Sequence, residues 1–92
     1  MTYKIIGETN PWIAQRDIDF NGKTKIVIED NMSLRDANKR LLSMFNDDYE
    51  GERGAYIPNW GLAIAHGYPV YHHTDGTYSY SYDSRNYRVE AE

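Results

Sequence analysis

Three histidines are the side chains best suited to acid–base chemistry or metal binding at neutral pH. A metal site would need two of them to converge with a carboxylate such as Asp75 or Asp83. His72 and His73 are adjacent, and adjacent side chains of a strand point to opposite faces of its sheet. At most one of them can therefore join His66, so the sequence predicts neither a metal nor another cofactor.

A ligand-binding or active site formed by His66, His72 and Asp83 is the remaining arrangement for chemistry. It would lie against a strand predicted over residues 59–66, where glycine and alanine alternate with large side chains. A face of small residues allows a ligand or another backbone to approach closely. The chain has no phosphate-binding glycine loop, nucleophile elbow or zincin motif. A small enzyme or ligand-binding protein is therefore the second hypothesis, and no residue is predicted to be catalytic.

Acidic side chains cluster where a predicted helix ends. They are Asp47, Asp48, Glu50 and Glu52. The dipole of a helix disfavours negative charge at its C-terminal end, so this cluster is either a solvated exit from the helix or a patch for a cationic partner. Its spacing does not fit a calcium-binding loop. The patch supports a third hypothesis, an inhibitor that binds a basic, nucleic-acid-binding protein.

Aromatic residues favour an interaction surface. The chain has nine tyrosines against two phenylalanines, and tyrosine combines an apolar body with a polar tip. Trp12 follows Pro11 in a predicted turn. It is the best candidate for an exposed anchor, although packing over the edge of a sheet would explain it equally well. Without a catalytic constellation, the leading hypothesis is a non-enzymatic interaction module that binds a protein partner or a second copy of itself.

Composition restricts the partners and the compartment. Ten Lys and Arg residues against fourteen Asp and Glu give a net charge of −4, with no basic run, so nucleic-acid binding is disfavoured. The absence of cysteine excludes disulfides and gives no sign of an oxidising compartment. No apolar run is long enough for a signal peptide or a membrane span. We expect a single domain over residues 1–92 in the cytoplasm, away from membranes.

An amphipathic helix over residues 33–49 is expected to organise the chain. At ~100° per residue its apolar side chains fall within one arc. They are Leu34, Ala37, Leu41, Leu42, Met44, Phe45 and Tyr49. Ser33 is the predicted N-cap, with Asp36 three residues later. Because the pattern elsewhere indicates short strands, the surface that covers this arc should be a sheet.

Three strands are predicted before the helix. The first covers residues 2–6 and stops at Gly7, and Asn10-Pro11 then forms a turn. The other two, over residues 13–20 and 24–29, should form a hairpin around a central Asn-Gly pair.

The register of that hairpin is predicted from its charges. A three-residue loop with Gly22 in a left-handed bulge sets Asp17 opposite Lys25 and Asp19 opposite Lys23. It also gives one apolar face, made of Ile18, Ile26 and Ile28. The two aspartates are thus expected to be cross-strand charge partners rather than catalytic or metal-binding groups.

Strands are predicted again after the helix. Residues 59–66 should form a central strand whose large face meets the helix, and residues 68–92 a meander with turns at Asp75-Gly76 and at 83–86. A four-residue second loop makes a core-facing ladder of Tyr78, Tyr80 and Tyr82 opposite Ala91, Val89 and Tyr87. A three-residue first loop is preferred, because it places Val70 inside.

Residues 59–63 and the stretch over residues 75–87 resemble small uncharacterised proteins of bacteria and their mobile elements. The resemblance rests on Asn59-Trp60-Gly61-Leu62-Ala63, Asp75-Gly76-Thr77, Tyr82-Asp83-Ser84-Arg85 and Tyr87. It covers the last third of the chain and implies no activity, but it makes the proposed inhibitor a mobile-element protein. The element order also resembles a β-grasp fold, from which the insertion over residues 7–20 and the tyrosine-rich tail depart.

The predicted fold is therefore α+β. We expect a mainly antiparallel, twisted sheet of about five to seven short strands. One amphipathic helix, over residues 33–49, should pack on one face of that sheet.

Overall fold

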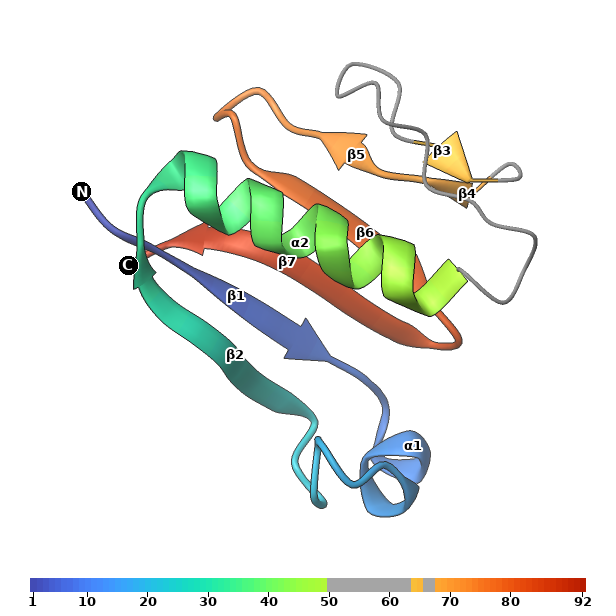
Figure 1. Ribbon diagram of the computed structural model, residues 1–92. Coiled ribbons are helices and arrows are strands. Elements are labelled where there is room, and N and C mark those ends of the chain that lie inside the picture. The colour runs from blue at the N-terminus through green and yellow to red at the C-terminus, as the bar shows by residue number, and fades with distance from the viewer. Residues whose placement is uncertain (50–63, 66–67) are drawn as a thin grey trace.

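The computed structural model describes residues 1–49, 64–65 and 68–92. Its elements are β1 (Tyr3–Glu8), α1 (Pro11–Arg16), β2 (Lys25–Met32), α2 (Leu34–Tyr49), β3 (Ile64–Ala65), β4 (Tyr68–Pro69), β5 (Tyr71–His72), β6 (Tyr78–Tyr82) and β7 (Arg85–Ala91). Five strands form an antiparallel sheet in the order β2-β1-β7-β6-β5, and α2 crosses one face of it (Figure 1). The predicted α+β class, with one amphipathic helix on an antiparallel sheet, is confirmed.

Helix α2 begins and packs as its sequence predicts. Ser33 Oγ accepts a hydrogen bond of 3.1 Å from the Asp36 N–H, as an N-cap should. The buried residues of the helix are Ala37, Leu41, Leu42, Phe45 and Tyr49. They meet Ile5, Tyr80 and Val89 of the sheet and Val70, which directly precedes β5. Each large apolar side chain buried here contributes about 1.5–3 kcal/mol, so this layer is the main source of stability.

The prediction of a strand over residues 13–20 is wrong, because the chain forms helix α1 here. Asn10 is the N-cap of this helix, and its Oδ1 accepts a hydrogen bond of 2.8 Å from the Ile13 N–H. Pro11 occupies the first turn, where the missing N–H costs no hydrogen bond. Asn10 and Pro11 therefore start a helix rather than a turn between strands.

The predicted hairpin around Asn21-Gly22 is wrong for the same reason. These two residues do turn the chain, with positive φ angles of 49° and 85°, but a helix and a turn precede them. Ile18, expected on an apolar face, is 90% exposed. Phe20 is the buried residue of this segment instead, and its ring packs beside Gly7 and Tyr87.

Strand β1 continues through Gly7 to Glu8, two residues beyond its predicted end. Its partner β2 lies at an edge of the sheet; it begins one residue after the start of the predicted strand and ends three residues beyond the predicted end. The register of this pair shifts twice, between Tyr3 and Ile5 and between Ile5 and Ile6. Such irregularities in an edge strand discourage pairing with another chain.

The predicted central strand over residues 59–66 lies mostly outside the described residues. Its described part, β3, pairs with β4 in a separate two-stranded sheet. In the main sheet the inner positions belong to β1, β7 and β6.

The hairpin of β6 and β7 is closed by Asp83-Ser84 alone, both with positive φ, and not by the predicted four-residue loop. Tyr80 consequently pairs with Tyr87 rather than with Val89. A shift of two residues keeps every side chain on its face. Tyr80 is therefore buried, the other two tyrosines of β6 pack against the core, and the predicted core-facing ladder is confirmed.

The loop before β6 has the predicted three residues, 74–76. His72 pairs with Tyr78, and Val70 lies inside with 8% of its surface exposed.

Candidate interaction groove

A hollow of about 470 Å³ lies between the end of α2, strand β2 and the turn that follows α1. We call it the acidic groove. Its apolar and aromatic lining consists of Phe20, Ile26, Val27, Ile28, Met44, Tyr80 and Tyr87. Its charged lining consists of Asp19, Arg40, Asp47 and Asp48. Phe20 and Tyr80 are almost completely buried beneath it, so half-buried Tyr87 and the aliphatic side chains supply the apolar part of its surface, beside the charged rim.

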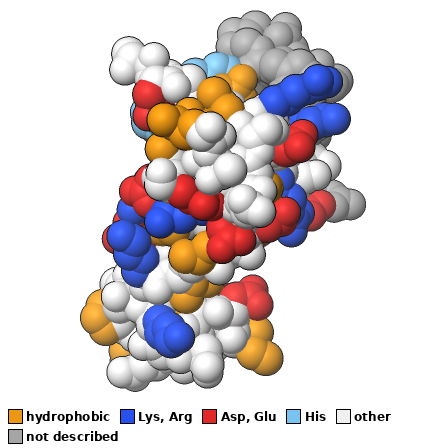
Figure 2. Space-filling model, turned by 90° about the vertical axis from the view of Figure 1, so that its left-hand side faces the viewer, with side chains coloured by type: hydrophobic (Ala, Val, Ile, Leu, Met, Phe, Trp, Pro, Cys, Tyr) orange, Lys and Arg blue, Asp and Glu red, His pale blue; other side chains and the backbone are white. Residues whose placement is uncertain are grey.

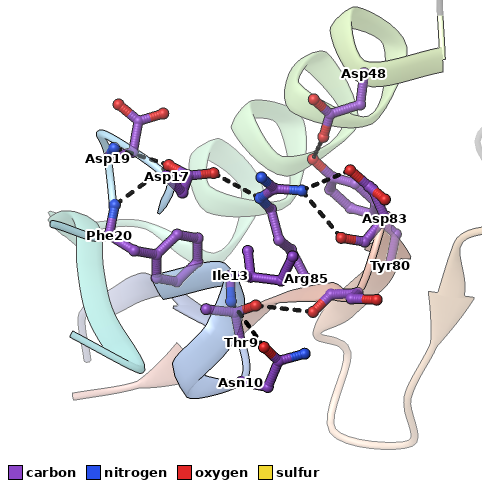
Figure 3. Close-up of polar contacts among 11 residues, drawn as sticks. Thr9, Asn10, Ile13, Asp17, Asp19, Phe20, Asp48, Tyr80, Asp83 and Arg85 are labelled. Atoms are coloured by element: carbon purple, nitrogen blue, oxygen red, sulfur yellow. Dashed lines mark hydrogen bonds and ion pairs between the residues drawn. The ribbon is translucent and has the colours of Figure 1, made fainter. Parts of the chain in front are cut away.

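The inner end of the groove holds a carboxyl–phenol pair. Tyr80 donates a hydrogen bond of 2.6 Å to Asp48 Oδ2 (Figure 3). Burial raises the pKa of Asp48, although this hydrogen bond and the charge of Arg85 act in the opposite direction. Burial and the neighbouring carboxylate raise the pKa of Tyr80 far above its ordinary value, and burial raises the pKa of Tyr87 to about 12. Both phenols are therefore uncharged at neutral pH.

Next to this pair, Arg85 is neutralised by two carboxylates. Its Nε donates to Asp17 Oδ2 at 2.6 Å and its Nη1 to Asp83 Oδ2 at 3.0 Å (Figure 3). Asp17 is thus not the cross-strand partner that the hairpin prediction made it. Burial alone would raise the pKa of Asp17, but the hydrogen bonds from Arg85 and from two backbone N–H groups of the following turn lower it overall.

The groove itself carries a net negative charge. Asp19 lines it, instead of pairing across a hairpin as predicted, and so do Asp47 and Asp48. Among the described residues, Arg40 is the single cationic side chain of the lining, and it forms an ion pair of 3.3 Å with Glu29.

Half of the predicted acidic patch can be placed. Asp47 is exposed, and Asp48 is half-buried against Tyr80. Glu50 and Glu52 lie outside the described residues. Sequence reasoning did not place Asp19 in this site, although Asn10 followed by Pro11 is a helix-start signal that would have put Asp19 in a turn after a helix.

Trp12 is exposed, as the interaction hypothesis predicts, but it lies on α1 rather than in a turn. The structure leaves 67% of its surface accessible, and Arg16 Cζ lies 5.5 Å from the ring centroid. On the face seen in Figure 2, charged side chains of both signs cross the middle. Hydrophobic side chains flank its lower part, at the height of α1 in Figure 1.

His72 and Asp83 do not come together. His72 lies beside the first residue of β6, and Asp83 follows the last. The His72 ring stacks on Tyr78, with centroids 4.1 Å apart and planes 5° apart. His66, the third residue of that hypothesis, lies outside the described residues. Within the ranges 1–49, 64–65 and 68–92, no three His, Cys, Asp or Glu residues are grouped to hold a metal ion.

A serine–histidine contact lies elsewhere, on the hairpin of β5 and β6. His73 Nε2 is 2.7 Å from Ser79 Oγ, and both residues are solvent-accessible. The carboxylate of nearby Asp75 is held by Thr77, whose N–H and hydroxyl both donate to Asp75 Oδ1. A contact between side chains across the end of this hairpin accounts for the arrangement without a catalytic role.

Neither helix in the described part of the chain is long and apolar enough to cross a membrane. Comparisons with protein-family models, with curated proteins and with solved structures found no match. The function is therefore inferred from the acidic groove and from Trp12.

Proposed function

We propose that this protein is a non-enzymatic module that binds another protein. The observation that carries the proposal is the acidic groove, an open hollow lined by both apolar and charged side chains. Exposed Trp12 lies on α1, and the turn that follows α1 forms a wall of the groove. Tryptophan and tyrosine are enriched among the residues that dominate binding energy at protein interfaces.

The proposal is tested by affinity capture from the lysate of the native host, identified by mass spectrometry, together with light scattering on the purified protein. Wild type is compared with Trp12→Ala, and Ile18→Ala serves as a matched control, because Ile18 is also exposed on the segment between β1 and β2. An anchor tryptophan contributes about 2 kcal/mol or more to the free energy of binding. Trp12→Ala should therefore weaken the affinity for a specific partner by about thirtyfold or more. Circular dichroism must show that both variants are folded.

A stable monomer without a partner would refute the proposal. A partner that both variants still bind would support the interaction module but would show that Trp12 is not its anchor.

A second candidate function is the inhibitor of a basic, nucleic-acid-binding protein. It is favoured by the way Asp47 and Asp48 join Asp19 at one groove. Its test is the salt dependence of partner capture, because attraction between exposed charges is screened as ionic strength rises. Capture that does not change with salt would rule this function out.

A further inference from the structure

We infer that the acidic groove binds an arginine side chain, together with an apolar neighbour, from a segment of the partner protein. The inference rests on the proposed function and names the chemistry of its partner. Two features of the groove carry it, the half-buried Tyr87 ring with the aliphatic side chains beside it and the unequal charges of the rim.

Three rings pack in succession beneath the groove, and half-buried Tyr87 is the one that a guanidinium can reach, because Phe20 and Tyr80 each have only 1% of their surface exposed. The centroids of Phe20 and Tyr87 are 6.5 Å apart, and those of Tyr87 and Tyr80 are 5.1 Å apart. Guanidinium groups stack on aromatic faces, and the alkyl stem of arginine packs against apolar surface. Met44 and Ile28 extend the apolar lining beyond the rings, which gives room for a second, apolar side chain.

The rim selects a cation. Asp19, from the turn after α1, and Asp47, from the end of α2, are exposed in the lining of the groove, while Asp48 at its inner end already accepts the hydrogen bond from Tyr80. The cations already present are engaged, since Arg40 pairs with Glu29 and Arg85 with two aspartates. A planar guanidinium can bind a carboxylate through two parallel hydrogen bonds, which a lysine ammonium cannot do.

The size of the groove favours a protein segment over a small ion. A hollow of about 470 Å³ falls in the range of sites that enclose several side chains or a small molecule. In the part of the chain that the structure describes, the carboxylates are not grouped to hold a metal ion. The remaining occupant that satisfies both the apolar lining and the rim is a long cationic side chain with an apolar neighbour.

The test begins with phage display of short random peptides on the immobilised full-length protein. Wild type is compared with Asp47→Lys, which reverses a charge on the rim. Asp30→Lys is the matched control, because Asp30 is exposed on β2 and does not line the groove. Lysine near the C-terminal end of a helix is favoured by the dipole, so Asp47→Lys is expected to fold. Asp19→Asn, on the other wall, provides an independent second variant.

Peptides enriched on wild type should carry arginine beside a large apolar residue. The strongest is then synthesised with a fluorescent label, and its affinity is measured by fluorescence anisotropy. Asp47→Lys should weaken binding by about tenfold or more, Asp30→Lys by less than about twofold, and arginine-to-lysine exchange in the peptide should also weaken it.

Three outcomes would overturn the inference: no enrichment, enrichment without arginine, or equal binding by wild type and Asp47→Lys. The proposed function fails separately, when capture from the lysate yields no partner. If binding of a partner depends on Trp12 but not on Asp19 or Asp47, the protein is still an interaction module, but the groove is not its binding site.

Discussion

The hydroxyl of Tyr80 is the only part of that side chain that Tyr80→Phe removes. The substitution leaves half-buried Asp48 without the donor that lies 2.6 Å from its carboxylate. We expect the free energy of unfolding to fall by about 1–3 kcal/mol, the usual cost of a polar group left without its partner. Urea unfolding at neutral pH measures this. Tyr82→Phe is the control on the same strand, and an equal loss in both variants would contradict the role of the Asp48 contact.

The ion pair of Asp17 and Arg85 predicts how stability depends on pH. Asp17→Asn should lower the free energy of unfolding by about 1.5–3 kcal/mol at neutral pH, which is the usual contribution of a hydrogen bond to a charged group. Because the folded state lowers the pKa of Asp17, its contribution is complete above the unfolded pKa of about 3.9 and is lost as pH falls through the lower folded pKa.

The difference in stability between wild type and Asp17→Asn should therefore shrink in acid below about pH 4. Denaturant unfolding at a series of pH values checks this. A difference that stays constant across the series would show that the carboxylate charge contributes nothing.

At the scale of elements, Gly7 determines how the segment between β1 and β2 docks on the sheet. A Cβ at this position would lie 3.2 Å from both Phe20 Cζ and Tyr87 Cε1. Gly7→Ala should therefore destabilise the fold by about 1–3 kcal/mol through overpacking. Thermal unfolding measures it. Shortening the neighbour in the double variant Gly7→Ala/Phe20→Leu should cost less than the sum of the two single changes, and simple additivity would count against this packing.

Helix α2 was predictable because its signals are local. Its apolar arc repeats at helical spacing, and Ser33 lies three residues before an acidic residue. Helix α1 was equally signalled by Asn10 and Pro11, but a strand was predicted because the Asn-Gly pair after it is typical of a hairpin. A two-residue turn signal does not specify what precedes it.

The acidic groove was only partly predictable. Asp47 and Asp48 were expected to form a patch, because they follow each other at a helix end. Asp19 could not be added, since its position depends on α1, and Asp17 is 68 residues from Arg85. Contacts of such sequence separation follow from the fold as a whole. The tyrosine ladder tolerated a wrong loop length, because an error of two residues preserves the alternation of faces.

The whole molecule is expected to open unevenly. Strands β1 and β7 lie inside the sheet, and α2 packs over them, whereas α1 lies beyond the end of β1 (Figure 1). Native-state hydrogen exchange should show the slowest amides in β1, β7 and α2, and faster exchange in α1, because segments with few buried contacts open at lower free energy. Equal protection in α1 and β7 would contradict this order.

The position of β7 next to β1 has a consequence for biosynthesis. About 80 residues separate the end of β1 from the end of β7, which at a ribosomal rate of 5–20 residues per second corresponds to roughly 4–16 s. During that delay the nascent chain can form the β1–β2 hairpin and α2, while the inner side of β1 lacks its partner. The register shifts of β2 protect only the outer edge of this hairpin. The interval before β7 emerges is therefore when the nascent chain most needs a chaperone.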